Sequence, residues 1–129
     1  MTTFVIDAFA WVEYFEGSAL GEKVKEIVED KGNTIFTSVI TLAELSSFYG
    51  RKNKSFDEAQ KILLSLCSIF PLSFEDAVEC GTIHADMRKE RKHIGLADCI
   101  VLHTARKVKG KIVTGDQDFR GMKDALMIK

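Results

Sequence analysis

The chain has 129 residues, enough for one domain with a single hydrophobic core and too few for two. Hydrophobic residues make up 46% of it and charged residues 29%, an ordinary balance for a globular protein. The formal net charge of −1 gives no overall attraction for polyanions, so a nucleic acid would have to be held by a local basic patch or by a bound cation.

The first half of the chain alternates short β-branched runs with stretches of helical periodicity. Gly50 is expected to end the third helix, and Ser55 with Glu58 forms a capping-box pattern that opens the fourth. In chain order we expect a strand at residues 3–6, helices at 8–17 and 18–30, a strand at 34–37, and helices from 38 to 49 and from 55 to 66.

The second half continues the alternation and contains Pro71, the only proline of the chain, which is tolerated in an edge strand but not in a central one. Gly110 is expected to end the last helix. The elements are a strand at residues 68–72, helices at 73–92 and 95–109, a strand at 111–114 and a short strand at 125–128. Strands that alternate with helices, without hairpin signals, predict an α/β protein with a parallel sheet covered on both faces.

The cysteines and histidines show no ligand spacing for a metal and no paired-cysteine motif. The three cysteines are odd in number and lie among apolar residues, which is typical of reduced, buried cysteine in a cytoplasmic protein. The three histidines are assigned structural or surface roles. No apolar run is long enough to span a membrane, and no basic segment followed by a long apolar run indicates a secretion signal. The cysteines are Cys67, Cys80 and Cys99, and the histidines are His84, His93 and His103.

Four acidic residues stand in separate, mostly apolar stretches, each where a helix is expected to begin and usually just past a strand. Side chains at the carboxyl ends of neighbouring parallel strands converge, and converging carboxylates repel one another unless a cation lies between them. A ligand set made only of oxygen atoms suits Mg²⁺ or Mn²⁺ rather than zinc. The four acids are Asp7, Glu44, Asp98 and Asp116.

Each acid also has a structural interpretation, which the sequence leaves open. Asp7 and Asp116 follow strands and could cap a helix or a turn. Glu44 stands three residues after Thr41 in a capping-box pattern, and Asp98 lies in a first helical turn, where the helix dipole favours negative charge. Asp98 nevertheless interrupts an apolar helix, and no lysine or arginine stands at a helical spacing that could neutralise it. A cation shared with Asp7 and Asp116 is therefore the simplest partner for this carboxylate.

Four segments of the chain, FVIDAFAWVEYF, TSVITLAELSSF, IGLADCIVLHTAR and IVTGDQDF, resemble the PIN domains, in particular the toxin nucleases of VapBC toxin–antitoxin pairs. The segments span the chain from end to end, and the strand followed by T-G-D-x-D-F is the most specific of them. The resemblance implies that residues 1–129 form a single flavodoxin-like domain of three layers, with about five parallel strands in the order 3-2-1-4-5. That order places the strand with Pro71 at an edge of the sheet.

The resemblance also implies the roles of the site residues. Asp118 would be a weaker ligand that acts through water, and Thr114 would orient a carboxylate or a water molecule. Phe9 departs from the family pattern, which usually has a small polar residue there, so a hydrogen bond beside the first ligand is missing or supplied elsewhere. One or two Mg²⁺ or Mn²⁺ ions would be held by Asp7, Glu44, Asp98 and Asp116.

The function implied by the resemblance is that of a metal-dependent endoribonuclease, the toxin of a type II pair, with an RNA substrate, a cognate antitoxin and a homodimeric state. The alternatives are a PIN-type nuclease of RNA maturation without an antitoxin, and a catalytically weak PIN scaffold, toward which Phe9 points. A receiver-like fold with an aspartyl-phosphate ranks last. Its chemistry requires a lysine near the end of a late strand, whereas Lys111 stands at the beginning of its strand.

Basic and aromatic residues suggest how RNA would be held, and each group has a structural alternative. The basic clusters 51–54, 88–92 and 106–111 would contact the phosphate backbone, or are solvated helix ends. Trp11, Tyr14 and Phe15 would stack on bases, or fill the core or a protein interface.

Overall fold

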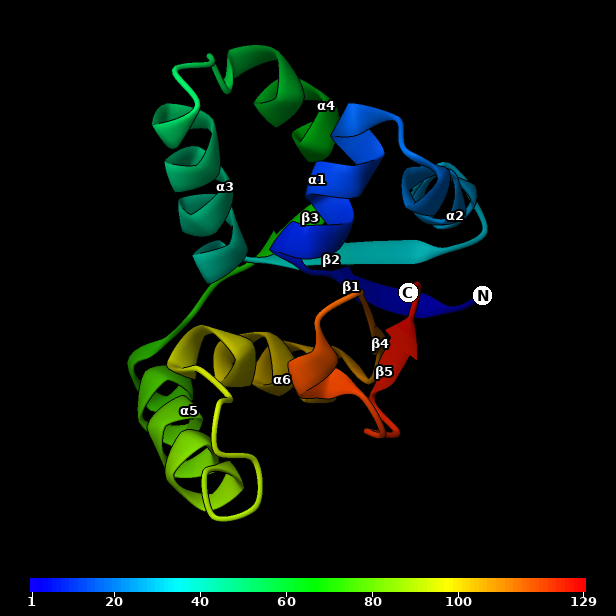
Figure 1. Ribbon diagram of the computed structural model, residues 1–129. Helices are drawn as coiled ribbons and strands as arrows, with labels where there is room; N and C mark the ends of the chain where they lie inside the picture. Colours follow the sequence, from blue (N-terminus) through cyan, green and yellow to red (C-terminus); the bar gives the residue numbers. More distant parts are fainter.

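Five parallel strands form one sheet in the order β3-β2-β1-β4-β5, as the computed structural model of residues 1–129 shows (Figure 1). The predicted strand order and the parallel arrangement are therefore confirmed. The strands are β1 (Thr3–Ile6), β2 (Thr34–Ser38), β3 (Ser68–Phe70), β4 (Lys111–Thr114) and β5 (Ala125–Met127). Pro71 follows directly after the edge strand β3, where a missing backbone donor does not interrupt a central ladder.

Helices cover both faces of the sheet and give the molecule three layers. In Figure 1 the first four helices lie on one side of the sheet and the last two on the other. The change of side follows from the strand order, because the chain leaves the β3 edge and crosses past β1 to enter β4. The helices are α1 (Ala8–Glu16), α2 (Ala19–Val28), α3 (Val39–Arg51), α4 (Asp57–Leu66), α5 (Phe74–Met87) and α6 (Leu96–Val108), and a 3₁₀ turn, η1, spans Gln117–Phe119.

Successive side chains of the central strands pack into two separate hydrophobic cores, one on each face of the sheet. In β1, Ile6 belongs to the core under α1 and α2, whereas Val5 belongs to the core under α6. The neighbouring strand β4 repeats the pattern with Val113 and Ile112, since successive side chains of a strand point to opposite faces. Trp11 of α1 is fully buried in the first core, so the interpretation that it stacks on bases is wrong.

Two predicted helix boundaries in the first half are wrong. Helix α3 runs through Gly50 to Arg51, and the chain turns only at Asn53, which has a left-handed φ of 55° that asparagine tolerates. Gly50 weakens the last turn without breaking it. Helix α4 begins at Asp57 and lacks a side-chain cap, because the hydroxyl of Ser55 accepts a bond from the Asp57 backbone instead of forming the predicted box with Glu58.

Two boundaries in the second half also differ from prediction. Helix α5 ends at Met87, not near Lys92, because the charged residues that follow offer no apolar face to bury. Lys109, rather than Gly110, takes the left-handed conformation after α6, with φ 55°. Gly110 serves a different purpose: a Cβ atom there would stand 2.9 Å from the carbonyl oxygen of Thr3, so glycine permits this close approach to β1.

The cysteines are free, with Cys80 and Cys99 buried and Cys67 half-buried. His103 is buried and lies 2.7 Å from Asp76, which confirms a structural role for that histidine. No helix has both the length and the apolar character that crossing a bilayer requires.

Candidate metal centre

Asp7 occupies the first position after β1 and is buried. One carboxylate oxygen accepts a hydrogen bond of 2.9 Å from the backbone of Ala10, so Asp7 does cap α1. The other oxygen accepts a bond from the hydroxyl of Thr114, at the end of the neighbouring strand β4. The capping interpretation and the site interpretation therefore apply to the same residue, because each uses a different oxygen.

Thr114 joins the ends of β1 and β4. Its buried hydroxyl donates to Asp7 and accepts a bond of 3.0 Å from the backbone of Asp116. Asp116 in turn accepts a bond of 2.9 Å from the backbone of Asp118, and thereby caps η1. This chain of bonds fixes the segment after β4 at the point where the strand order reverses, the usual place for a ligand site in an open α/β sheet.

Three carboxylates form a cluster beside this segment. Oxygen atoms of Asp98, Asp116 and Asp118 all lie within 4.8 Å of one another, and all three residues are half-buried. Asp98 is anchored by a bond of 3.0 Å from the backbone of Gly95 to one of its oxygens. Asp118, expected to be the weaker candidate, lies fully within this cluster.

Glu44 lies in the second turn of α3 and is exposed. Its capping interpretation is wrong, because Ser38 caps α3 by accepting a bond from the backbone of Ile40. Glu44 and Asp7 fall outside the three-carboxylate cluster, yet their charges act on it and on each other. The structure thus gathers five acids around one region, with three of them in closest approach.

Burial and mutual repulsion raise the pKa of three of these acids. Loss of hydration dominates at Asp7 and, with the charges of Asp116 and Glu44, outweighs its hydrogen bonds and raises its pKa to about 7. Loss of hydration followed by the charges of Asp98 and Asp116 raises the pKa of Glu44. The pKa of Asp98 is also raised, first by burial and then by Asp116 and Asp118, against the bond from Gly95.

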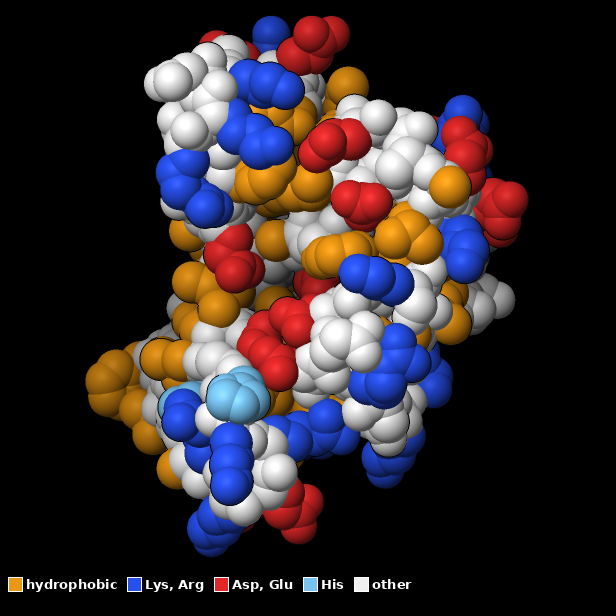
Figure 2. Space-filling view, in the orientation of Figure 1, with side chains coloured by type: hydrophobic (Ala, Val, Ile, Leu, Met, Phe, Trp, Pro, Cys, Tyr) orange, Lys and Arg blue, Asp and Glu red, His pale blue; other side chains and the backbone are white.

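No cationic side chain compensates this negative charge. The ion pairs of the protein involve Asp76, Glu79, Asp86 and Asp124, and none of the five acids. In Figure 2 acidic side chains gather in the middle of the face shown, between the helices of the two layers, with lysine and arginine side chains around them. A cluster of oxygen ligands without its own counter-charge fits a hard divalent cation such as Mg²⁺ or Mn²⁺.

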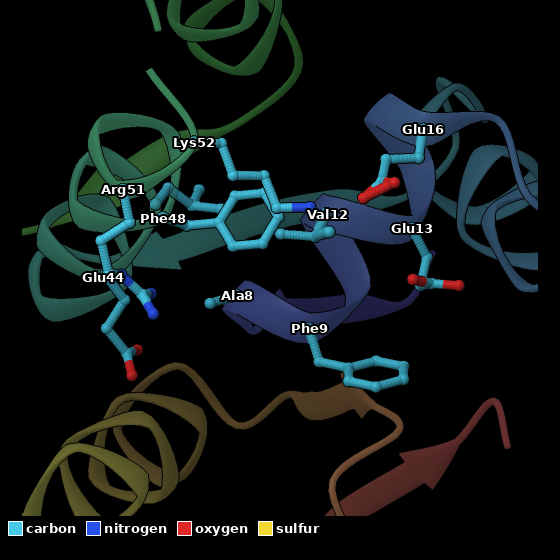
Figure 3. A pocket seen from close by; sticks show the side chains of 10 residues that line it. Ala8, Phe9, Val12, Glu13, Glu16, Glu44, Phe48, Arg51 and Lys52 are labelled. Carbon is cyan, nitrogen blue, oxygen red and sulfur yellow. The ribbon is translucent and has the colours of Figure 1, made fainter. Parts of the chain in front are cut away.

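A groove of about 430 Å³ lies next to the acids, between α1 and α3. Figure 3 shows Glu44 at one end of this groove and the side chains of Arg51 and Lys52 along the α3 wall. Glu13 and Glu16 line the α1 wall, so the groove has one acidic and one basic side. Half of the lining is apolar: Ala8, Phe9, Val12, Leu45 and Phe48.

Phe9, the departure from the family pattern, packs against the segment that carries the acids. A Cβ atom on Gly115 would stand 2.2 Å from the ring of Phe9, so this ring lies directly on the backbone between Thr114 and Asp116. The hydrogen bonds to Asp7 come from Ala10 and Thr114 instead.

Sequence reasoning missed two features of this region. Arg91 reaches from the turn after α5 to the backbone of η1, a contact across 27 residues that no periodicity or spacing indicates. The second feature is the lining of the groove, which could not be derived because α1 and α3 are not neighbours in sequence.

The fold and the acidic centre together define a class: an α/β domain with strand order 3-2-1-4-5 and clustered carboxylates at the carboxyl edge of β1 and β4. The family model of the PIN domain matches residues 4–125. The chain belongs to the PIN domain family.

Solved structures share this fold over nearly the whole chain. A toxin–antitoxin complex from Klebsiella pneumoniae is 22% identical, with a TM-score of 0.70 and 97% of each chain covered. VapBC2 from Rickettsia felis, bound to a DNA fragment from their promoter, is 21% identical, with a TM-score of 0.73 and coverage of 98% of this chain and 97% of the other. VapC20 from Mycobacterium tuberculosis, a sarcin–ricin loop cleaving toxin, is 17% identical, with a TM-score of 0.74 and coverage of 94% and 95%. A search of curated proteins gave no match.

Proposed function

We propose that this protein is a Mg²⁺- or Mn²⁺-dependent endoribonuclease that acts in the cytoplasm as the toxin of a type II toxin–antitoxin pair. The observation that carries the proposal is the cluster of Asp98, Asp116 and Asp118, three carboxylates within 4.8 Å of one another and without an ion-pair partner. Membership of the PIN domain family and the similarity in fold to a sarcin–ricin loop cleaving toxin support an RNA substrate.

The residues of the site divide into ligands and residues that place them. Asp98, Asp116 and Asp118 would hold the cation, with Asp7 and Glu44 at its border. Thr114 orients Asp7 and the backbone of Asp116 through its single hydroxyl group. A cation held there would supply positive charge that lowers the pKa of a water molecule and offsets the charge that develops on the scissile phosphate. Attack of water on the phosphorus would break its bond to the 3′ oxygen, which takes a proton from the water and leaves as a 3′-hydroxyl, while the phosphate remains on the 5′ end of the other fragment.

The half-buried position of the three acids suits this chemistry. Their oxygens are close enough to share one cation and remain open to solvent, from which both water and a phosphate group must arrive. Lysine and arginine side chains border the acidic region on the face shown in Figure 2. They give the RNA backbone a local attraction that the net charge of −1 does not provide.

The groove between α1 and α3 is the proposed site of the antitoxin. Its apolar floor fits an amphipathic segment, and its acidic and basic walls would orient such a segment by charge. Because Glu44 lines one end, an occupant would cover the approach to the acids. The similar structures include several toxin–antitoxin complexes, which supports a protein partner of this kind.

A homodimer is the proposed oligomeric state. Phe74 and Val78 stand four residues apart on one face of α5, and their side chains are 80% and 59% exposed. Large apolar side chains that share an exposed face indicate a protein contact. Light scattering coupled to gel filtration should give twice the mass of the 14.5 kDa chain, and Phe74→Glu should return the mass of a monomer.

The metal mechanism is tested by incubating purified protein with total RNA in Mn²⁺ or in EDTA. Cleavage should require Mn²⁺ and should be lost in Asp98→Asn. Asp86→Asn is the matched control, because Asp86 is a solvent-exposed acid paired with Lys89 and lies outside the site. Cleavage that persists in EDTA, or in Asp98→Asn, contradicts the proposal.

The toxin role is tested separately in growing bacteria. Induced expression should stop growth, and co-expression of the product of a small adjacent reading frame should restore it. Phe48→Asp, which places a charge in the groove, should keep the growth arrest and lose the rescue. Continued growth with an enzyme that is active in vitro would favour the alternative, a nuclease of RNA maturation.

A further inference from the structure

Arg91 connects the loop after α5 to the turn that carries Asp118. Its Nη1 atom donates to the backbone carbonyl oxygen of Asp118 at 2.9 Å and to that of Arg120 at 3.0 Å. Arg91 is half-buried and pairs with no acidic side chain. Both hydrogens of one guanidinium nitrogen are therefore donated to backbone carbonyl groups of a single short turn.

The turn that carries Asp118 is closed by backbone bonds from Phe119 to Asp116 and from Arg120 to Gln117, and none of these bonds uses the Asp118 carbonyl oxygen. The η1 segment is three residues long, and Phe119 anchors it in the core beneath α6. The backbone N–H of Asp118 bonds to Asp116 within the same segment. Its carbonyl oxygen bonds only to Arg91, which is the one residue outside the segment that fixes the backbone of Asp118. A charge-assisted bond at this point is stronger than a neutral one.

The same loop also places the opposite side of the cluster. Gly95, four residues after Arg91, donates its N–H to Asp98, and Ile94 between them is fully buried. Residues 91–95 thus fix Asp98 through one contact and Asp118 through another. This stretch therefore connects the two segments that carry these carboxylates.

We propose that Arg91 is a positioning residue, which holds Asp118 beside Asp98 and so sets the affinity of the three-carboxylate cluster for a divalent cation. This inference rests on the proposed function, in which that cluster holds Mg²⁺ or Mn²⁺. Arg91 contacts the carbonyl oxygen and leaves the carboxylate oxygens of Asp118 free. The contact therefore restrains the backbone of Asp118 without occupying its ligand atoms.

An RNA-phosphate contact is the competing role for Arg91, because it belongs to the basic cluster 88–92. The two roles differ in what they change. A phosphate contact would alter RNA binding and leave the affinity for the cation intact. A positioning contact alters the affinity for the cation in the absence of any RNA.

The experiment measures Mn²⁺ binding to the RNA-free protein by titration calorimetry and by electron paramagnetic resonance. Arg91→Ala should weaken Mn²⁺ binding about tenfold or more, the usual loss when a group that supports a metal ligand is removed. Arg91→Lys, which keeps the charge but replaces the rigid planar guanidinium with a flexible ammonium group, should fall between Arg91→Ala and the wild type. Lys92→Ala, at an exposed neighbouring position, is the control and should bind Mn²⁺ like the wild type.

The outcomes separate the two proposals. Wild-type affinity in Arg91→Ala, with or without weaker RNA binding, overturns the positioning role and leaves the proposed function standing. Absence of Mn²⁺ binding in the wild-type protein overturns both. If Arg91→Ala unfolds, Arg91→Lys carries the test, and equal Mn²⁺ affinities of a folded Arg91→Lys and the wild type contradict the proposal.

Discussion

Two groups of carboxylates in this protein have opposite surroundings. Asp76 on α5 bonds through one oxygen to His103, at 2.7 Å, and through the other to the backbone and hydroxyl of Ser73, at 3.0 and 2.9 Å. The bond to His103, followed by those from Ser73, lowers the pKa of Asp76 to about 2. Asp98 has one backbone donor and two neighbouring carboxylates, and its pKa is raised.

The comparison contrasts an acid that stabilises the fold with acids that we propose to hold a cation. A structural carboxylate is satisfied within the protein, and its charge strengthens the contact between α5 and α6. The carboxylates at the sheet edge are held together against their repulsion, which costs stability until a cation binds. The four predictions that follow exchange or remove these features.

The largest effect is expected from matched substitutions in the two groups. Asp116→Asn should lower RNA cleavage about a hundredfold or more, because it removes a ligand rather than a supporting group, and should leave the thermal unfolding temperature near that of the wild type. Asp76→Asn should do the reverse, with cleavage retained and the unfolding temperature lowered. Cleavage rates and thermal unfolding of both variants check this, and equal loss of cleavage in the two would contradict it.

The buried Asp7 should make the metal-free protein less stable as pH rises. Its carboxyl group loses its proton near pH 3.8 when unfolded but only near 7 when folded, so this contribution declines between about pH 4 and 7. Asp7→Asn should remove this decline and be more stable than the wild type at pH 8, by about 2–4 kcal/mol. Urea unfolding in EDTA at pH 5 and pH 8 measures it. A wild-type stability that rises over this range relative to the variant would refute the assignment.

Cation binding should return stability to the acidic cluster. A ligand that binds only the folded state at a hundred times its dissociation constant adds about 2.7 kcal/mol. Thermal unfolding of the wild-type protein should therefore shift upward with Mn²⁺, whereas Asp116→Asn should show little shift. A chloride salt of a monovalent cation at equal ionic strength controls for screening, and an equal shift in both proteins would mean that Mn²⁺ binds elsewhere.

The smallest effect concerns the structural pair. Because the folded-state pKa of Asp76 is lowered to about 2, its stabilising contribution is full above about pH 4 and is lost as pH falls through about 2. His103→Gln weakens the leading cause of that shift, so it should lower the unfolding temperature at pH 6 by about 4 °C and flatten the acid dependence. An unchanged acid dependence in His103→Gln would show that Ser73 alone sets the pKa of Asp76.

The sequence predicted the strands and the acids that follow a strand, because these depend on local composition and on the general behaviour of parallel sheets, whereas the strand order was implied only by the resemblance to PIN domains. Asp7 and Asp116 are of this kind. Glu44 was found as a candidate, but its place beside the other acids depends on how α3 packs against α1 and α6. Its predicted capping role failed because Ser38, three residues earlier than Thr41, provides the cap.

Contacts across long stretches of chain were beyond prediction. Asp118 lies within the three-carboxylate cluster because the chain turns at η1. The hydrogen bond from Arg91 to that turn joins residues that are 27 positions apart. His103 and Asp76 are equally distant, and neither lies in a motif that indicates the pair. Such partners are chosen by packing of helices, which composition and periodicity do not specify.

The acids at the sheet edge come from both halves of the chain. Asp7 and Glu44 belong to the half that ribosomes make first, whereas Asp98, Asp116 and Asp118 belong to the last third. If the proposed nuclease activity is correct, a nascent chain that has not reached Asp118 lacks part of the cation site, so it cannot cut RNA before that segment has been made and folded.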